Sequence, residues 1–209
     1  TACCWEADPM DLVHAFLNLV PVTLSQSLIY AFVALGIMIP FRLLSFPDLP
    51  GLRPTPDRVR ETVFNWLGQT LDGLDVLDAF AGSGAMGLEA ASRGARRVML
   101  VEKAAPAAQS LRNQARELGM SRVEVTCADA LAWLMHCRDS FDVIFLDPPF
   151  ASELLARILP LAAERVRADG CIYIECGQWP TIPDGWQLVR SGQAGAVHYG
   201  LLRRVTDES

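Results

Sequence analysis

A glycine-rich turn between an apolar segment and a helical one constrains the fold of this chain more than any other feature of its sequence. Residues Gly82-Ser83-Gly84-Ala85-Met86-Gly87 match the pattern G-x-G-x-x-G and follow the apolar segment Leu74–Ala79, which predicts a short strand. Glycines in this pattern allow a tight turn and a close approach of the backbone to a ligand. Glu102 follows Gly82 after twenty residues, at the end of the next predicted strand, where a carboxylate can accept hydrogen bonds from ribose hydroxyls. The pattern therefore predicts a strand–turn–helix unit that binds a nucleotide-like ligand.

From Leu52 onward, apolar strand patterns alternate with amphipathic helix patterns. A helix start is predicted at Thr55-Pro56-Asp57, with an N-cap, a proline at the first helical position and an acid in the first turn. Strands that alternate with helices predict a mostly parallel sheet covered on both faces, and right-handed crossovers favour a doubly wound, Rossmann-like α/β fold. The further predicted strands are Arg97–Val101, Val123–Thr126, Phe141–Leu146, Cys171–Glu175 and Val197–Leu202. The helices after the glycine turn are predicted to end at Arg93 and to span Ala104–Leu118, Ala128–His136 and Ser152–Val166.

The carboxylate of Asp78 bears on which ligand the turn binds, because NAD and S-adenosylmethionine sites share the glycine pattern and the later acid. Asp78 lies near the end of the first predicted strand, four residues before Gly82. A carboxylate there would repel the pyrophosphate of a dinucleotide, which favours a bare helix N-terminus. S-adenosylmethionine instead carries an α-ammonium group and a sulfonium, and both favour a nearby negative charge. The turn therefore predicts an S-adenosylmethionine site, and an NAD-dependent oxidoreductase is the disfavoured alternative.

The loop after the third predicted strand has two interpretations. Asp129 lies in Cys127-Ala128-Asp129-Ala130, a loop that lies beside the adenine in this fold, so its carboxylate can accept a hydrogen bond from the adenine amino group. It can equally be the N-cap of the helix that follows. The predicted cofactor-binding residues are Asp78, Phe80, Ala81, Gly82, Ser83, Gly84, Glu102, Asp129 and Ala130.

The motif Asp147-Pro148-Pro149-Phe150 is the most specific signal in the chain and predicts the catalytic residues. It ends the fourth apolar strand, at the edge where doubly wound sheets place their ligands. Two prolines remove two backbone donors and hold the preceding residues extended. The Pro148 carbonyl and the Asp147 carboxylate then offer two acceptors to an exocyclic amine, and Phe150 offers a flat face for an unstacked base.

An exocyclic amine of a base is a poor nucleophile, because its lone pair is delocalised into the ring. Two acceptors on its hydrogens can favour tetrahedral geometry at the nitrogen and direct the lone pair at a sulfonium methyl. Asp147 can also accept the proton that is released after attack. The motif and the glycine turn together predict transfer of a methyl group to an exocyclic amine of a nucleic-acid base.

The motifs quoted so far, and others around them, resemble those of the RsmD family, bacterial methyltransferases that modify guanine N2 in small-subunit (16S) ribosomal RNA. The resemblance covers residues 50–204. It implies a class I S-adenosylmethionine-dependent methyltransferase fold, with a seven-stranded, mostly parallel sheet whose last strand runs antiparallel. The matching segments are Pro50–Thr55, Arg58–Leu67, Asp78–Ala90, Asp147–Phe150 and Ile174-Glu175.

The charge of the chain gives RNA binding no support, since the formal net charge is −6 and nucleic-acid binders usually carry a basic surface. Arg53, Arg58 and Arg60 are candidates for a local RNA-binding patch, and a solvated helix face explains them equally well. The six cysteines form no Cys-x-x-Cys pair and no zinc-like spacing with histidine, so we expect reduced thiols, a cytoplasmic protein and no metal site.

Residues 1–49 differ in character from the rest. Between Asp11 and Arg42 there is no charged residue, and Leu28–Phe41 is almost wholly apolar. Residues 12–49 resemble the first membrane helix of some ABC-transporter permeases, which makes this segment the only predicted contact with a membrane. It stands where members of the RsmD family carry a short glycine-rich, basic segment. We therefore divide the chain into an atypical segment 1–49, a methyltransferase domain 50–204 and a tail 205–209.

Three functions remain to be compared. The sequence favours an S-adenosylmethionine-dependent guanine-N2 methyltransferase that acts, as an expected monomer, on small-subunit ribosomal RNA or on the assembled subunit. A DNA adenine-N6 methyltransferase is a close alternative, because Asp-Pro-Pro-aromatic serves either amine. The third is an inactive methyltransferase remnant fused to a membrane segment.

Overall fold

The structure, a computed structural model, describes residues 57–148 and 152–205. These residues belong to one compact unit, Asp48–Ser209. The strands are β1 (Asp75–Asp78), β2 (Arg97–Glu102), β3 (Val123–Cys127), β4 (Phe141–Leu146), β5 (Val166–Cys176), β6 (Trp186–Ala194) and β7 (Val197–Arg204). The helices are α2 (Asp57–Leu67), α3 (Ala85–Ser92), α4 (Ala105–Glu117), α5 (Ala130–His136) and α6 (Ser152–Ala163).

The strands form one seven-stranded sheet in the order β3-β2-β1-β4-β5-β7-β6. Strands β1 to β5 pair in parallel, whereas β7 is antiparallel to both of its neighbours. The sheet confirms the predicted class I methyltransferase fold, including its antiparallel last strand. Because β1 lies between β2 and β4, the segments that follow these three strands leave the same edge of the sheet, where a doubly wound fold binds its ligands.

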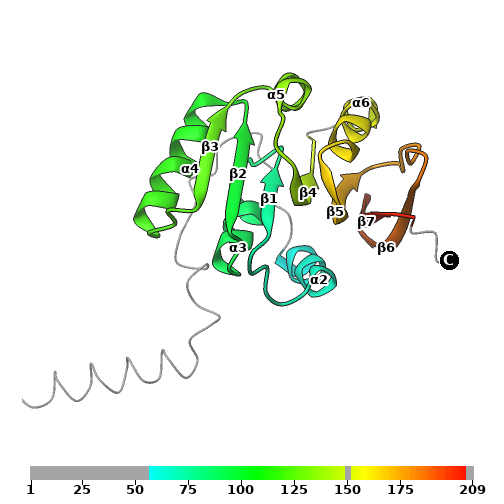
Figure 1. Cartoon of the computed structure of the whole chain (residues 1–209), viewed down its shortest axis with the longest axis horizontal. Coiled ribbons are helices and arrows are strands. Elements are labelled where there is room, and N and C mark those ends of the chain that lie inside the picture. The colour runs from blue at the N-terminus through cyan, green and yellow to red at the C-terminus, as the bar shows by residue number, and fades with distance from the viewer. Residues whose placement is uncertain (1–56, 149–151, 206–209) are drawn as a thin grey trace, which may run out of the picture. The chain divides into compact units, whose positions relative to one another are not determined.

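Helices cover both faces of the sheet, as Figure 1 shows for α5 and α6 on one side and α2 and α3 on the other. Alternate residues of each central strand enter two separate cores, because successive side chains of a strand point to opposite faces. In β1, Val76 packs in the core that contains Phe64 of α2. Its neighbour Leu77 packs in the core that contains Ile158 of α6. The central strands are therefore buried on both faces, which explains their continuous apolar sequences.

The largest differences from the sequence-based prediction concern the end of α6 with the start of β5, and strand β6. The sequence predicted a helix up to Val166, but α6 ends at Ala163, and Val166 begins β5 and pairs with Phe141. Strand β6, Trp186–Ala194, had no predicted counterpart. Among the described strands it lies at the edge and pairs only with β7, and none of its residues is buried. Its polar residues and Gly192 therefore carry little of the apolar pattern that marks an interior strand.

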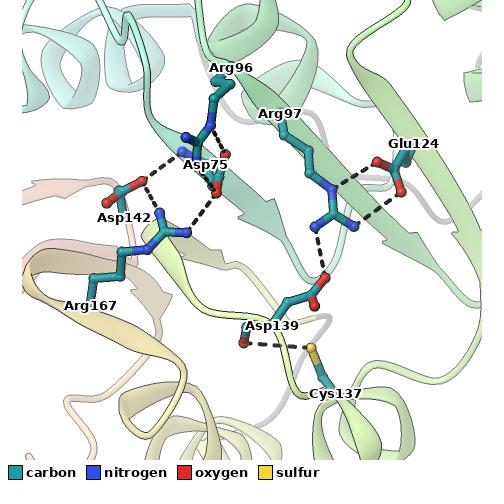
Figure 2. Close-up of polar contacts among 8 residues, drawn as sticks. All are labelled: Asp75, Arg96, Arg97, Glu124, Cys137, Asp139, Asp142 and Arg167. Atoms are coloured by element: carbon teal, nitrogen blue, oxygen red, sulfur yellow. Dashed lines mark hydrogen bonds and ion pairs between the residues drawn. The ribbon is translucent and has the colours of Figure 1, made fainter.

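A network of ion pairs joins the amino ends of the central strands (Figure 2). Asp75 starts β1 and accepts two hydrogen bonds from Arg96, at 2.9 and 2.6 Å. Figure 2 shows Arg96 and Arg167 on either side of Asp75, with the Asp75–Arg167 contact at 2.7 Å. Arg167 also pairs with Asp142, whose carboxylate accepts the backbone N–H of Asp75 at 2.7 Å. The network thus connects β1, β4 and β5 at the edge opposite the glycine turn.

Replacing Asp75 with asparagine should lower the free energy of unfolding at pH 7. Its hydrogen bonds with Arg96, and then those with Arg167, lower the pKa of Asp75 from 3.8 to about 2. Because Arg96 is exposed and Arg167 is partly exposed, we expect a loss of about 2 kcal/mol rather than the full value of a buried pair. A folded-state pKa below the unfolded one stabilises the protein above pH 4, and this contribution disappears as the pH falls toward 2.

Urea unfolding at pH 7 and at pH 3 measures this effect. The Asp75→Asn variant should differ from the parent protein most at pH 7 and by roughly half as much at pH 3, one pH unit above the folded-state pKa of about 2. Asp184→Asn serves as the control, since Asp184 is an exposed carboxylate. A variant as stable as the parent protein at pH 7 would show that the network contributes nothing to stability.

Several predictions concern residues that the structure does not describe. The apolar segment 1–49 with its resemblance to a permease helix, the N-cap at Thr55, Arg53 and the tail residues 206–209 lie outside the described residues. Pro149 and Phe150 also lie outside them. Within 57–148 and 152–205, no helix is both long enough and apolar enough to cross a bilayer.

Candidate active site

Acidic residues stand at the carboxyl ends of four neighbouring strands. Glu102 ends β2, Asp78 ends β1, Asp147 directly follows β4, and Glu175 is the penultimate residue of β5. In the sheet, Asp78 pairs with Phe145 of β4, and Leu146 pairs with Ile174 of β5, so these ends lie side by side. Sequence reasoning assigned roles to the first three and none to Glu175. The signal was present, because Glu175 is an acid at the end of an apolar strand, like Asp78.

The glycine turn is held by its own backbone and by Glu102. The Glu102 carboxylate accepts the backbone N–H of Gly82 at 2.9 Å and that of Ala104 at 2.7 Å. The N–H of Gly84 donates to the carbonyl of Ala81 at 2.6 Å. Gly82 and Gly84 have φ values of 52° and 83°, a region that side chains disfavour, and Gly84 is the N-cap of α3. Glu102 therefore fixes both the turn after β1 and the turn after β2.

The third glycine of the pattern lets α3 approach β1 and β2. A Cβ atom on Gly87 would lie 2.1 Å from Cδ2 of Leu100 and 3.3 Å from the Asp78 side chain. At this distance the backbone N–H of Gly87 donates to Oδ2 of Asp78 at 3.1 Å. The glycine thus brings the first turn of α3 onto the Asp78 carboxylate.

Asp78 is a buried carboxylate, with 3% of its surface exposed. Burial raises its pKa from 3.8 to about 7, against the effect of hydrogen bonds from the backbone of Gly87 and Phe80. The negative charges of Glu102 and Glu175 raise the pKa of Asp78 further. The turn therefore concentrates negative potential, which a cationic ligand would relieve.

These residues fit S-adenosylmethionine better than a dinucleotide. The ammonium and sulfonium groups of that cofactor are cations, and the Asp78 carboxylate lies at the turn where they would be received. A pyrophosphate would instead meet the carboxylate of Asp78 close to the start of α3, since Gly87 of that helix already donates to it. Beside Asp78, Ala81 is buried, whereas Phe80 and Ser83 are partly exposed and can contact a ligand.

Asp129 is the N-cap of α5. Its Oδ1 accepts the backbone N–H of Ala132 at 3.2 Å, and its Oδ2 pairs with the Lys103 ammonium at 3.2 Å. These contacts, the Ala132 hydrogen bond first, lower the pKa of Asp129. Asp129 thus caps α5, as one of its two interpretations predicted. Ala130 is buried in the first turn of the helix. The contact of Asp129 with adenine stays a prediction.

Asp147 and Pro148 are the described part of the predicted catalytic motif. They follow β4 without interruption, and Pro148 is buried while Asp147 is partly exposed. The negative charge of Asp147 contributes to the raised pKa of Tyr173 on β5, behind the larger effect of burial and the effects of Glu175. Asp147 therefore lies near enough to β5 for its charge to act there.

Two of the three candidate RNA-binding arginines are described, and they differ. Arg58 is exposed at the start of α2. Arg60 is largely covered, and its guanidinium pairs with Asp57 at 2.9 Å. Arg58 is therefore the better candidate for a phosphate contact, whereas the Arg60 charge is already compensated in part.

An aromatic pair lies beside the acidic strand ends. Tyr199 of β7 is opposite Glu175 in the sheet, and its ring stacks on Trp66 of α2 with a centroid distance of 5.5 Å. The Tyr173 hydroxyl donates to Oε1 of Glu175 at 2.7 Å. Glu175 is thus flanked by Tyr173 on its own strand and by Tyr199 on the next.

Comparison with known proteins agrees with this geometry. Residues 38–203 match the family described as conserved hypothetical protein 95. The chain is 39% identical to the ribosomal RNA small subunit methyltransferase D of Escherichia coli K12 over 168 residues, which are 78% of this chain and 85% of the relative. The corresponding protein of Haemophilus influenzae is 38% identical over 170 residues, covering 78% and 88%.

Comparison with solved structures also finds a methyltransferase. A putative methyltransferase of Escherichia coli, yhhF, superposes with a TM-score of 0.69 at 36% identity and covers 76% of this chain and 92% of its own. The family match begins at residue 38, upstream of the boundary that the sequence predicted at residue 50. The chain therefore belongs to the conserved hypothetical protein 95 family, together with the ribosomal RNA small subunit methyltransferases D that it resembles.

Proposed function

We propose that this protein transfers a methyl group from S-adenosylmethionine to the exocyclic N2 amine of a guanine in small-subunit ribosomal RNA. The observation that carries the proposal is the position of Asp147-Pro148 at the end of β4, beside the end of β1 that bears Asp78. One strand end thus offers acceptors to an amine, and its neighbour offers negative charge to a sulfonium. The relatives named ribosomal RNA small subunit methyltransferase D support methyl transfer to that RNA.

The cofactor supplies an electrophilic methyl group on a positively charged sulfur. Asp78 and the glycine turn would hold its amino-acid portion, and Glu102, which already fixes the turn, would accept hydrogen bonds from the ribose hydroxyls. Asp147 and the Pro148 carbonyl orient the N2 amine, so that its lone pair points along the line of transfer. The amine would become cationic when it gains the methyl group, and Asp147 would take the proton that the nitrogen then loses.

The RNA is proposed from the relatives' names rather than from the charge of this chain. With a formal net charge of −6, the protein needs a local contact with phosphate, and exposed Arg58 is the described candidate. A ribosomal substrate would place the protein in the cytoplasm. We expect it to act as a monomer, and sedimentation tests that expectation.

Transfer of labelled methyl groups from S-adenosylmethionine to under-methylated small ribosomal subunits tests the proposal. Naked ribosomal RNA and DNA serve as parallel substrates, and digestion to nucleosides identifies the labelled base. We expect label in N2-methylguanosine. Label in DNA adenine would replace the proposal with the adenine-N6 alternative. Cofactor binding without label in any substrate would support the inactive remnant.

A further inference from the structure

Glu175 is a buried carboxylate whose orientation is fixed by a neighbouring side chain. It is 8% exposed, and one of its oxygens accepts the Tyr173 hydroxyl at 2.7 Å. Burial first, and then Glu175 itself, raise the pKa of Tyr173, so the hydroxyl remains a donor at neutral pH. A carboxylate has about four lone-pair sites, so it can accept from further donors beside Tyr173.

The sheet places Glu175 next to the proposed acceptors of the amine. Leu146 of β4 pairs with Ile174 of β5, so the residues that follow them, Asp147 and Glu175, are neighbours on adjacent strands. Parallel strands lie about 4.8 Å apart, which is within the span of one base edge and its hydrogen bonds. On the other side, Tyr199 stacks on Trp66, so Glu175 lies between the catalytic motif and an aromatic wall.

We propose that Glu175 selects guanine by accepting the N1–H of the target base. The inference rests on the proposed function and adds the group that distinguishes guanine from adenine. Guanine presents two neighbouring donors, N1–H and the N2 amine, whereas adenine presents a lone pair at N1 beside its N6 amine. When the N2 amine binds Asp147 and the Pro148 carbonyl, the N1–H of the guanine faces β5. Glu175 lies there, next to Asp147. Adenine in the same place would direct its N1 lone pair at a carboxylate, which is repulsive.

The test uses target RNA in which the methylated guanine, once mapped, is replaced by 2-aminopurine or by inosine. The base 2-aminopurine keeps the exocyclic amine and has an acceptor at N1, whereas inosine keeps N1–H and lacks the amine. The parent enzyme should methylate the guanine RNA with a kcat/KM about 10- to 100-fold above that for the 2-aminopurine RNA, the range of one good base contact. Inosine RNA should inhibit it competitively, and more strongly than an RNA with adenosine at that position.

The variant Glu175→Gln should change this preference. The glutamine carbonyl can still accept the Tyr173 hydroxyl, while its amide group can donate to N1 of 2-aminopurine. We expect the ratio of kcat/KM for guanine to that for 2-aminopurine to fall at least tenfold. Glu117→Gln, at an exposed position near the end of α4, is the matched control and should keep the ratio of the parent enzyme.

The outcomes separate this inference from the proposed function. An unchanged ratio in Glu175→Gln would mean that N1–H is read elsewhere, for example by Asp147, and would overturn the inference. Equal inhibition of the parent enzyme by inosine and adenosine RNA would overturn it without any variant, even if Glu175→Gln did not fold. Absence of methylation of guanine RNA by the parent enzyme would contradict the proposed function instead.

Discussion

Replacing Asp147 with asparagine should slow methyl transfer by about 10²- to 10³-fold, the usual cost of one group that orients and stabilises a transition state. Asparagine keeps the shape of the side chain and one acceptor. It lacks the negative charge that stabilises the developing ammonium and accepts its proton. The loss should fall on kcat, because the interaction strengthens only as the amine becomes cationic.

Single-turnover transfer of labelled methyl groups measures this step, and equilibrium dialysis measures cofactor affinity in parallel. Affinity for S-adenosylmethionine should change far less than the transfer rate. Asp169→Asn is the control, since Asp169 is an exposed carboxylate of β5 far along the strand from its carboxyl end. The smallest such effect leaves about a hundredth of the rate, so a variant that keeps a tenth or more would remove Asp147 from the mechanism.

Replacing Asp78 with asparagine should have two effects of opposite sign. The pKa of Asp78 is about 7 in the folded protein, against 3.8 in the unfolded chain, so ionised Asp78 destabilises the cofactor-free protein. At ~1.4 kcal/mol for each pKa unit, the upper limit of this cost is about 4 kcal/mol. Asparagine removes the charge and still accepts the Gly87 N–H, so the free energy of unfolding at pH 8 should rise by about 2 kcal/mol. Affinity for S-adenosylmethionine should fall about 100-fold, because a buried charge partner is lost.

The pH dependence identifies Asp78 as the cause. A carboxyl whose folded pKa lies above its unfolded pKa makes the protein less stable as the pH rises from about 4 to 7, and the cost is complete above 7. Because the cationic cofactor favours the ionised form, its affinity should rise over the upper part of the same range, with proton release below pH 7. Calorimetric titration in buffers of different ionisation enthalpy measures that proton. Its persistence in Asp78→Asn would assign it to another group.

The sequence predicted the structure best where the backbone conformation requires a particular residue type. Gly82 and Gly84 occupy the left-handed region, and Gly87 permits a close approach, so the turn is encoded locally and was predicted at the right place. The acids Asp78 and Asp147 were identified because they end apolar strands. The doubly wound, mostly parallel arrangement was predicted from the rules for parallel sheets.

Other features depend on contacts between distant parts of the chain. Strand β6 is polar and depends on its pairing with β7, so its own residues show no pattern that predicts a strand. Asp75 and Arg167 are 92 residues apart, and no local pattern indicates that they meet. The place of Glu175 beside Asp147 follows from the register of β4 and β5, which a sequence alone does not specify.

The ion-pair network at the amino ends of the strands has a consequence for protein engineering. Asp75, Arg96, Asp142 and Arg167 fasten three strands at the end of the sheet that bears no predicted site residue. The loops at the opposite edge of the sheet can therefore be randomised to change base preference. Substitutions there that lower the free energy of unfolding should still leave the sheet folded. Tolerance of the fold to substitution, as distinct from activity, should be uneven: high in the loop that follows β5, and low among the charged residues that precede β2 and begin β1.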